Sequence, residues 1–191
     1  MTTIMARCWN TQNPLYIRYH DEEWGVPVHE ERKLFELLSL EGFQAGLTWE
    51  LVLKRREALR KAFSDFDPLT VAKYRLEHVE SILGNSSVIR NRAKVVATIN
   101  NAQRFIEIQS EFGTFDKFIW QFVNGKPVKH AFKSMSEMPA QTDESRAMSD
   151  ELKRRGFKFV GPTICYAFMQ AVGMFNDHLV FCFRYGQIAK M

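Results

Sequence analysis

Gly156-Phe157-Lys158-Phe159-Val160-Gly161-Pro162-Thr163 is the stretch that decides the fold. It follows Glu151–Arg155, a run whose cations suit the negative end of a helix dipole. Gly156 can end that helix, and Pro162 is favoured as the first residue of the next one because its missing N–H would be unpaired there anyway. The spacing therefore predicts two helices joined by a tight, basic hairpin.

A hairpin of this kind presents backbone N–H groups to an anion, and DNA phosphate is the obvious candidate. The predicted DNA contacts are Gly156, Lys158, Val160 and Gly161. For an isolated pattern of two glycines with four residues between them, a plain helical hairpin without a ligand is the better interpretation. The choice between the two therefore depends on the rest of the chain.

The composition is that of a globular protein of one or two small domains. The chain has 191 residues, 46% of them hydrophobic, and a mean hydropathy of −0.27. We predict one unit over residues 1–191, in which two helical lobes with a pocket between them are an allowed arrangement. Without a run of 18 apolar residues there is no membrane span, and Met1–Cys8 lacks the apolar core of a signal peptide. We expect a cytoplasmic monomer.

Helical periodicity dominates the sequence, and no stretch alternates cleanly with a period of two, so we predict an all-α fold. The expected helices are Glu30–Leu40, Thr48–Phe63, Pro68–Tyr74, Leu76–Leu83, Val88–Phe112, Phe115–Val123, one that Thr142 caps, and Ile164–Val172. Residues 8–29 are expected to be irregular because Asn13-Pro14 and Gly25-Val26-Pro27 interrupt them. Residues 124–141 are expected to form the main loop.

Basic residues gather in separate clusters, although the net charge is only +4. The clusters are Lys54-Arg55-Arg56, Arg60-Lys61, Arg90–Lys94 and Lys153–Arg155. Such clusters fit a face that contacts phosphates, because counterion release gives affinity for DNA of any sequence. The alternative, preferred for any single cluster, is an ordinary solvated helix surface.

A second informative stretch places a carboxylate, an amide and an indole close together, at Glu41, Gln44 and Trp49, where two glycines allow a sharp turn. With Tyr16 and Tyr19 these side chains can line an aromatic box that has one acceptor at its end. Such a box suits a flat cationic ligand through stacking and cation–π attraction. A capping glutamate and a core tryptophan are the alternative, which composition alone favours.

Cys8-x11-His20 and His178-x3-Cys182 together offer the ligands of a tetrahedral Cys2His2 zinc site. His178 and Cys182 are four residues apart and would share one face of a helix. Neither spacing is diagnostic, since a buried cysteine is more often a small hydrophobic residue. Cys165 falls in an apolar helix and is expected to be inert. A zinc site would clip the N-terminal segment to the C-terminal end of the chain.

Several dispersed motifs agree in order from about residue 8 to residue 182. They are Cys8 with Asn13-Pro14-Leu15-Tyr16, then Tyr19-His20-Asp21, Glu23-Trp24-Gly25-Val26-Pro27, Leu40-Glu41-Gly42, Gln44-Ala45-Gly46-Leu47-Thr48-Trp49, Gly156–Gly161 and Asn176-Asp177-His178. In these motifs the chain resembles the 3-methyladenine DNA glycosylase I family, which belongs to the helix-hairpin-helix superfamily of DNA glycosylases.

The resemblance implies a monofunctional enzyme of base excision repair. Such an enzyme hydrolyses the N-glycosidic bond of 3-methyladenine in alkylated double-stranded DNA and releases the free base. The implied fold is the helical glycosylase fold with one structural zinc per chain. By motif, the zinc ligands are Cys8, His20, His178 and Cys182, Glu41 is the carboxylate that contacts the base, and Tyr16, Tyr19, Gln44 and Trp49 belong to the pocket.

Two further residues bear on the reaction that the resemblance implies. Many superfamily members place a catalytic aspartate after the hairpin helix. Asp177 is near that position but directly precedes a candidate metal ligand, so we expect it to have a local structural role. Lyase members carry a lysine where this chain has Thr163, while Lys158 lies within the turn. We therefore expect no Schiff-base chemistry.

Two functions of other classes explain part of the pattern. A DNA-binding module without catalysis would use the hairpin and the basic clusters, but it leaves Glu41, Trp49 and the tyrosines without a reason to be together. A metal-clipped helical protein unrelated to DNA would make the basic hairpin accidental.

Overall fold

The computed structural model describes residues 6–191, which form ten α-helices, three short 3-10 helices and two short strands. The α-helices are α1 (Pro14–Glu22), α2 (Glu31–Gln44), α3 (Trp49–Ala62), α4 (Pro68–Val71), α5 (Leu76–Gly84), α6 (Arg92–Phe112), α7 (Phe115–Trp120), α8 (Asp143–Arg154), α9 (Pro162–Ala171) and α10 (Phe183–Ile188). The others are η1 (Ser64–Phe66), η2 (Gln121–Val123), η3 (Met135–Glu137), β1 (Val128–Lys129) and β2 (Phe175–Asn176). The absence of a signal peptide was predicted over residues 1–8, of which residues 1–5 lie outside the described part.

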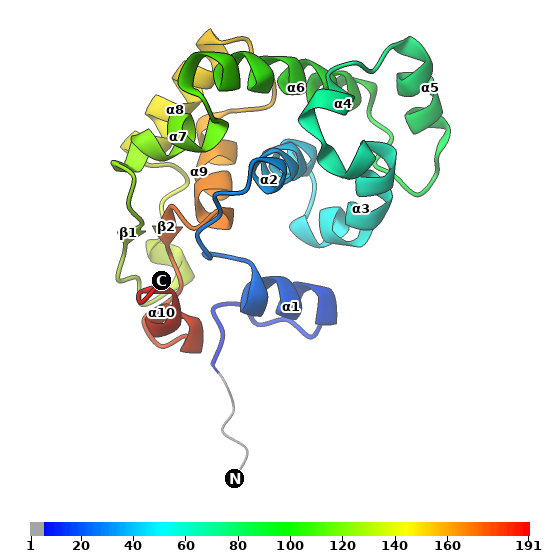
Figure 1. Ribbon diagram of the computed structural model, residues 1–191. Coiled ribbons are helices and arrows are strands. Elements are labelled where there is room, and N and C mark those ends of the chain that lie inside the picture. Colours follow the sequence, from blue (N-terminus) through cyan, green and yellow to red (C-terminus); the bar gives the residue numbers. More distant parts are fainter. Residues whose placement is uncertain (1–5) are drawn as a thin grey trace.

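Helix α2 forms the centre of the bundle, because it packs against α3, α6, α7 and α9 (Figure 1). Its residues from Leu34 to Phe43 are all buried. Phenylalanines supply much of the surrounding core, and Phe35, for example, packs against both Phe66 and Phe105. Burial of a side chain of this size stabilises a fold by roughly 1.5–3 kcal/mol. The stretch from Leu34 to Phe43 is therefore fixed by the core around it.

The hairpin between α8 and α9 is present as predicted. Thr142 caps α8 through a hydrogen bond from the Ser145 N–H, and Gly156 follows the last residues of α8 with a positive φ of 87°. Pro162 is the first residue of α9. The side chains of Phe157 and Val160 are buried, so the hairpin is anchored to the core by its own apolar residues.

The prediction that residues 8–29 are irregular is wrong, because Pro14–Glu22 forms α1. Asn13 is its N-cap, and its side chain accepts a hydrogen bond from the Leu15 N–H at 3.0 Å. A proline at the first helical position lacks only an N–H that would be unpaired, so Asn13-Pro14 starts a helix instead of breaking one. The extended segment begins only after Gly25, which has a φ of 80°.

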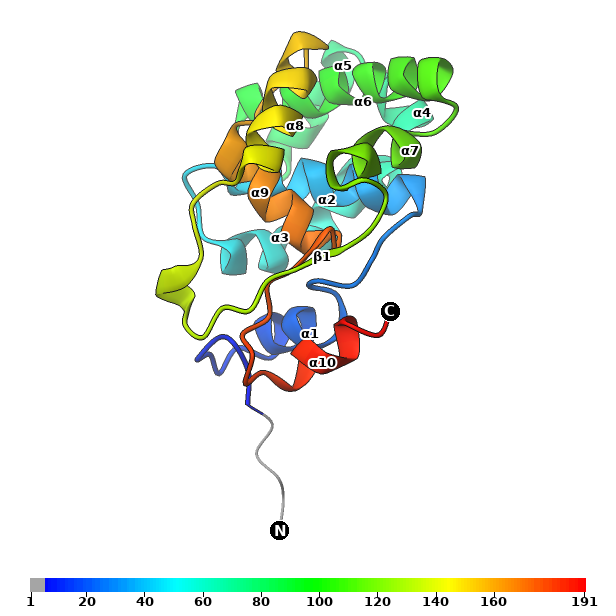
Figure 2. The same ribbon diagram turned by 90° about the vertical axis from the view of Figure 1, so that its left-hand side faces the viewer.

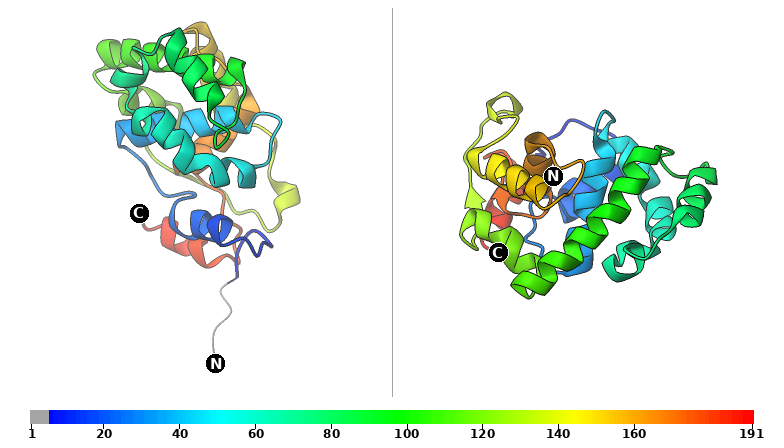
Figure 3. Two further views of the ribbon diagram at one scale, coloured as in Figure 1. Left: turned by 90° about the vertical axis from the view of Figure 1, so that its right-hand side faces the viewer. Right: turned by 90° about the horizontal axis from the view of Figure 1, so that it is seen from above.

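The C-terminal part holds a small exception to the all-α prediction. Strands β1 and β2 form a parallel pair in which Val128 is opposite Phe175 and Lys129 is opposite Asn176. The chain then continues into α10, which lies beside α1 at the end of the molecule away from α6 (Figure 3). Across residues 6–191, no helix combines the length and the apolar character needed to cross a membrane.

Candidate functional site: an aromatic pocket, a hairpin and a metal cluster

A cavity of about 150 Å³ lies between α1, the end of α2, the start of α3, α9 and η3. It is lined by Trp9, Tyr16, Tyr19, Trp24, Glu41, Gln44, Trp49, Met135, Met138, Ala167 and Gln170. The structure thus brings together all five residues that the sequence assigned to a pocket. The reasoning from sequence missed the other six. Trp9 and Trp24 stand in or beside the quoted motifs, whereas the two methionines come from a loop that carries no recognisable pattern.

Glu41 lies in the last turn of α2, not in a glycine-bent turn as predicted. Gly42 is still helical, and only Gly46, with a φ of 73°, needs the conformational freedom of glycine. Helix α2 runs to Gln44 because its apolar face continues through Phe43 into the core. Glu41 is therefore held by a rigid buried helix, which positions a side chain better than a loop does.

The Glu41 carboxylate is buried and incompletely paired. The residue is 4% exposed, and its Oε2 atom has no hydrogen-bond partner within residues 6–191. Burial raises the pKa of Glu41 to about 8. The Trp49 indole N–H in the same cavity also lacks a partner within the described residues. Because buried polar groups are normally paired, these two atoms indicate a place for a ligand.

Composition favoured a structural role for both residues, and the structure agrees for Trp49, which is part of the buried core, but not for Glu41. The N-cap of α2 is Glu30, and Thr48 caps α3, so Glu41 caps neither helix. The Trp49 ring is buried, but it borders the cavity and packs against Tyr19 at a centroid distance of 5.2 Å.

Aromatic rings form most of the cavity wall. Trp9 lies with its ring centroid 4.8 Å from that of Tyr16 and 4.7 Å from that of Trp24. It also stacks nearly parallel to Tyr19, at 6.2 Å and 11°. Such walls attract the faces of a flat heterocycle, and a positive charge on that heterocycle strengthens the attraction.

The hairpin lies on the same side of the molecule as the α2–α3 connection and η3, which border the cavity (Figure 2). Lys158 is exposed at its tip. The Val160 side chain is buried, so only its backbone can face a ligand. Within residues 6–191 the N–H groups of Val160 and Gly161 donate to no backbone acceptor.

The candidate metal ligands Cys8, His20, His178 and Cys182 are all buried, and their ligand atoms lie within 4.8 Å of one another. The His178 Nδ1 atom is 3.4 Å from Cys8 Sγ and 3.5 Å from Cys182 Sγ. The separation from Cys182 Sγ to His20 Nε2 is 3.6 Å. Tetrahedral zinc, with Zn–S of about 2.3 Å and Zn–N of about 2.0–2.1 Å, requires S···N separations of about 3.6 Å. The cluster therefore fits a tetrahedral divalent cation.

The second nitrogen of each histidine is already engaged. His20 Nδ1 lies 2.7 Å from Asp21 Oδ1, and His178 Nε2 lies 3.0 Å from the Trp24 carbonyl oxygen. Each ring then donates a proton outward and turns its other nitrogen toward the cluster, as metal-bound histidines do. The hydrogen bond with Cys8 lowers the pKa of Cys182, so a thiolate is favoured there.

One detail of the metal prediction is wrong, because His178 and Cys182 do not share a helical face. His178 lies in irregular backbone after β2, and Cys182 is the N-cap of α10. The turn between them, closed by a hydrogen bond from the Cys182 N–H to the Leu179 carbonyl, brings the two ligands together. The cluster joins the segment before α1, which carries Cys8, and α1 itself, which carries His20, to the segment before α10.

The Asp177 carboxylate does not line the pocket, and it is hydrogen-bonded to three other side chains. Its carboxylate accepts hydrogen bonds from Tyr166 Oη at 2.5 Å and Gln170 Nε2 at 2.7 Å, and it pairs with His130 Nδ1 at 2.6 Å. These contacts connect α9 to the loop that follows β1, and both border the cavity. The local role expected for Asp177 agrees with this geometry.

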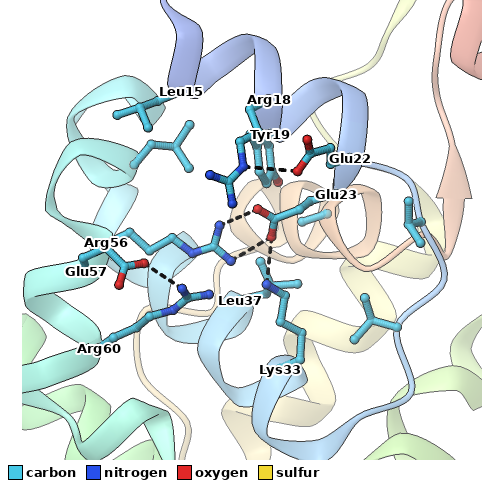
Figure 4. A pocket seen from close by; sticks show the side chains of 14 residues that line it. Leu15, Arg18, Tyr19, Glu22, Glu23, Lys33, Leu37, Arg56, Glu57 and Arg60 are labelled. Atoms are coloured by element: carbon cyan, nitrogen blue, oxygen red, sulfur yellow. Dashed lines mark hydrogen bonds and ion pairs between the residues drawn. The ribbon is translucent and has the colours of Figure 1, made fainter.

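Many cations of the predicted phosphate-binding face are paired with carboxylates. Arg56 is buried and donates to Glu23 and Glu36, which also pair with Lys33. Arg56, Glu23 and Lys33 border an open cavity of about 730 Å³ between α1, α2 and α3 (Figure 4). Arg92 pairs with Glu80 in the same way on the surface. Arg56 and Arg92 are therefore engaged in ion pairs, and the exposed Lys158 is a better candidate for phosphate contact than either of them.

Two helices joined by a tight hairpin, with an aromatic, carboxylate-bearing pocket on the same side, form the arrangement that the resemblance to the helix-hairpin-helix DNA glycosylases implies. The sequence pattern of the methyladenine glycosylase family matches residues 9–185. The chain is 50% identical over 182 residues to DNA-3-methyladenine glycosylase 1 of Escherichia coli strain K12, covering 95% of this chain and 97% of that protein. It therefore belongs to the methyladenine glycosylase family.

Two further comparisons agree. The chain is 45% identical over 180 residues to the DNA-3-methyladenine glycosylase of Haemophilus influenzae, with 94% of this chain and 97% of that protein covered. Its structure matches that of 3-methyladenine DNA glycosylase I from Staphylococcus aureus, solved to define 3-methyladenine recognition. The TM-score is 0.92 at 36% identity, over 95% of this chain and 97% of that one.

Proposed function

We propose that this protein is a monofunctional DNA glycosylase that hydrolyses the N-glycosidic bond of 3-methyladenine in alkylated double-stranded DNA, as a step of base excision repair. The observation that carries the proposal is the buried, unpaired Glu41 carboxylate in an aromatic cavity of about 150 Å³. The relatives named above are 3-methyladenine DNA glycosylases at up to 50% identity.

Methylation at N3 makes adenine cationic and turns it into a good leaving group. The target bond lies inside the duplex, so the nucleotide must be flipped out, which is easier when damage has weakened its pairing. The flipped base would stack between the aromatic walls and present its N–H groups to Glu41. Because the base is cationic, its arrival favours the ionised carboxylate, whose charge then stabilises the bound base.

Glu41 contacts the base in this proposal, while water attacks the sugar carbon after the bond has weakened. Tyr16, Tyr19, Gln44 and Trp49 shape the cavity around the base. Asp177 takes no part in catalysis, since its carboxylate already receives three hydrogen bonds outside the cavity. Thr163 stands at the start of the hairpin helix, so no amine is available there for a lyase reaction.

The hairpin would hold DNA through its backbone and Lys158, without reading sequence. Gly156 supplies the positive φ that ends α8. The N–H groups of Val160 and Gly161, which have no backbone acceptor within residues 6–191, would donate to a phosphate. Contacts of this kind fix the position of the duplex while the pocket selects the base.

We further propose that Cys8, His20, His178 and Cys182 hold one structural zinc per chain. When bound, zinc would supply a crosslink from Cys8 and from His20 of α1 to the segment before α10. Four protein ligands complete a tetrahedral shell, so no water would be activated there. These residues would fix α1, and with it Tyr16 and Tyr19, over the pocket.

The direct test is to incubate the protein with methylated duplex DNA and identify the released bases by chromatography. We expect free 3-methyladenine as the product. The matched control is Glu41→Gln, which keeps the size of the side chain and removes its charge. Release of no base, or equal release by both proteins, would contradict the proposal.

A further inference from the structure

Lys94 is a buried cation of α6 whose ammonium group lies at the C-terminal end of α2. The residue is 6% exposed and lies in the first turn of α6. Its ammonium group donates to the carbonyl oxygens of Phe43 at 2.8 Å and Ala45 at 2.6 Å. These carbonyls belong to the end of α2, where the helix dipole is negative, so the charge is compensated without a carboxylate.

The end of α2 needs such a partner because, among the described residues, no backbone N–H group donates to the Phe43 or Ala45 carbonyl. The C-cap Ala45, with φ −45° and ψ 114°, has left the helical conformation, and Gly46 follows with a φ of 73°. The Ala45 N–H reaches the Gly42 carbonyl only at 3.4 Å. Lys94 therefore fixes the path of the chain just after Glu41 and at Gln44, where two residues of the pocket stand.

The same face of α6 also holds the hairpin. Asn101 is seven residues after Lys94, which is close to two full helical turns. Its side chain accepts from the Lys158 N–H at 2.8 Å and donates to the Lys158 carbonyl at 2.9 Å. Asn100 adds a hydrogen bond to the Gly156 carbonyl at 2.9 Å.

These two attachments are joined by close packing between α2 and the hairpin. A Cβ atom added at Gly42 would lie 3.5 Å from Phe159 Cβ, which is ordinary van der Waals contact, so at this point the helix and the hairpin are no more than a methyl group apart. Gly42, Lys94, Asn101 and Phe159 border one small cavity. The right-hand view in Figure 3 looks down on α6, which crosses the molecule above these elements.

We propose that Lys94 is a positioning residue for the base pocket, and that Lys94 and Asn101 use one face of α6 to hold the pocket end of α2 and the hairpin in fixed register. The inference rests on the proposed glycosylase function. The distance between the site that binds phosphate and the site that receives the base is then set by a helix that touches neither ligand.

The test uses separate variants for the contact of Lys94 with α2 and the contact of Asn101 with the hairpin. Lys94→Met removes the charge and both hydrogen bonds at nearly constant length, Lys94→Arg restores charge and donors, and Asn101→Ala releases the hairpin. Lys117→Met, at an exposed lysine of α7, is the matched control. Each folded variant, verified by circular dichroism, is assayed for affinity to free 3-methyladenine, affinity to undamaged duplex DNA, and single-turnover excision.

We expect Lys94→Met to weaken binding of free 3-methyladenine and slow excision by about tenfold or more, while affinity for undamaged DNA changes less than twofold. Lys94→Arg should recover part of the loss, and Asn101→Ala should show the reverse pattern. If Lys94→Met does not fold, Lys94→Gln is judged by the same measurements.

Wild-type affinity for 3-methyladenine in a folded Lys94→Met or Lys94→Gln protein would overturn the inference alone. A wild-type protein that neither excises nor binds 3-methyladenine would overturn the proposed function as well.

Discussion

Replacing Glu41 with glutamine should stabilise the protein at neutral and alkaline pH while it abolishes most of the activity. The folded-state pKa of Glu41 is raised by burial to about 8, from an ordinary value of 4.5. In the unfolded chain the carboxyl group ionises freely above pH 4.5, so folding must suppress this ionisation. The penalty is absent below pH 4.5, grows as pH rises, and is complete above pH 8.

The size of the stability difference follows from the distance between the folded-state and unfolded-state pKa values of Glu41. At about 1.36 kcal/mol for each pH unit between the two pKa values, wild type should lose on the order of 3 kcal/mol relative to Glu41→Gln between pH 5 and pH 8. The variant has no charge to suppress at this position. Its stability advantage should therefore widen with pH and vanish near pH 4.5.

Chemical unfolding of both proteins at pH 5 and pH 8 measures this difference, and other groups cancel because only residue 41 differs. Single-turnover excision on methylated DNA, measured alongside, should fall by about a hundredfold or more in the variant if the carboxylate stabilises the cationic base. Equal pH dependence of stability in the two proteins would refute the reasoning, since it would mean that the carboxylate is solvated or paired.

Three other perturbations test the framework around the pocket. Burial opposes ionisation of Glu23 and Glu36, but hydrogen bonds from Arg56 outweigh it and lower the pKa of both to about 2. The two ionised carboxylates therefore stabilise the fold above pH 4.5, and this stabilisation is lost as pH falls toward 2. Arg56→Met should lower the free energy of unfolding by about 3–5 kcal/mol at pH 7. Urea unfolding at several pH values should also show a weaker dependence on acid pH in the variant. Cys182→Ser should lower metal content, measured by elemental analysis, together with the melting temperature, and full metal loss without any fall in stability would contradict the structural role. Lys158→Ala should weaken binding to any duplex and make the log–log salt dependence shallower by about 0.9 for each phosphate that the variant no longer neutralises. An unchanged slope would show that Lys158 faces away from DNA.

The hairpin and the main helices could be predicted because their signals are local. Gly156 and Pro162 mark the end of one helix and the start of the next, and the structure has both where the sequence indicates. Asn13-Pro14 carries an equally local signal with the opposite meaning from the one predicted, since the same pair that interrupts a helix interior begins a helix when asparagine is the cap.

The pocket could be predicted only in part, because its wall is assembled from distant segments. Glu41, Gln44 and Trp49 are near one another in sequence and share a motif. Gln170 and Met135 reach the same cavity from α9 and from the loop after β1, and nothing in their own neighbourhoods marks them. Likewise, Lys94 belongs by sequence to a basic cluster typical of a solvent-exposed surface, whereas the structure buries it at the end of α2.

The two buried carboxylates near the pocket, Asp177 and Glu41, differ in how fully they are paired. Asp177 is satisfied by three donors, whereas Glu41 is left without a full set of partners. A carboxylate that must stabilise a sugar cation has to reach the sugar, and Asp177 is held away from the cavity by its contacts. A carboxylate that must recognise a cationic base has to remain unpaired until the base arrives, and Glu41 meets this condition. Because the methyl group already weakens the bond, selecting the cationic base is the larger task, and in the proposed function Glu41 is the carboxylate that performs it. The instability that Glu41 brings is then tolerable because Arg56 and the Cys2His2 cluster secure α1, the helix that closes the pocket over it.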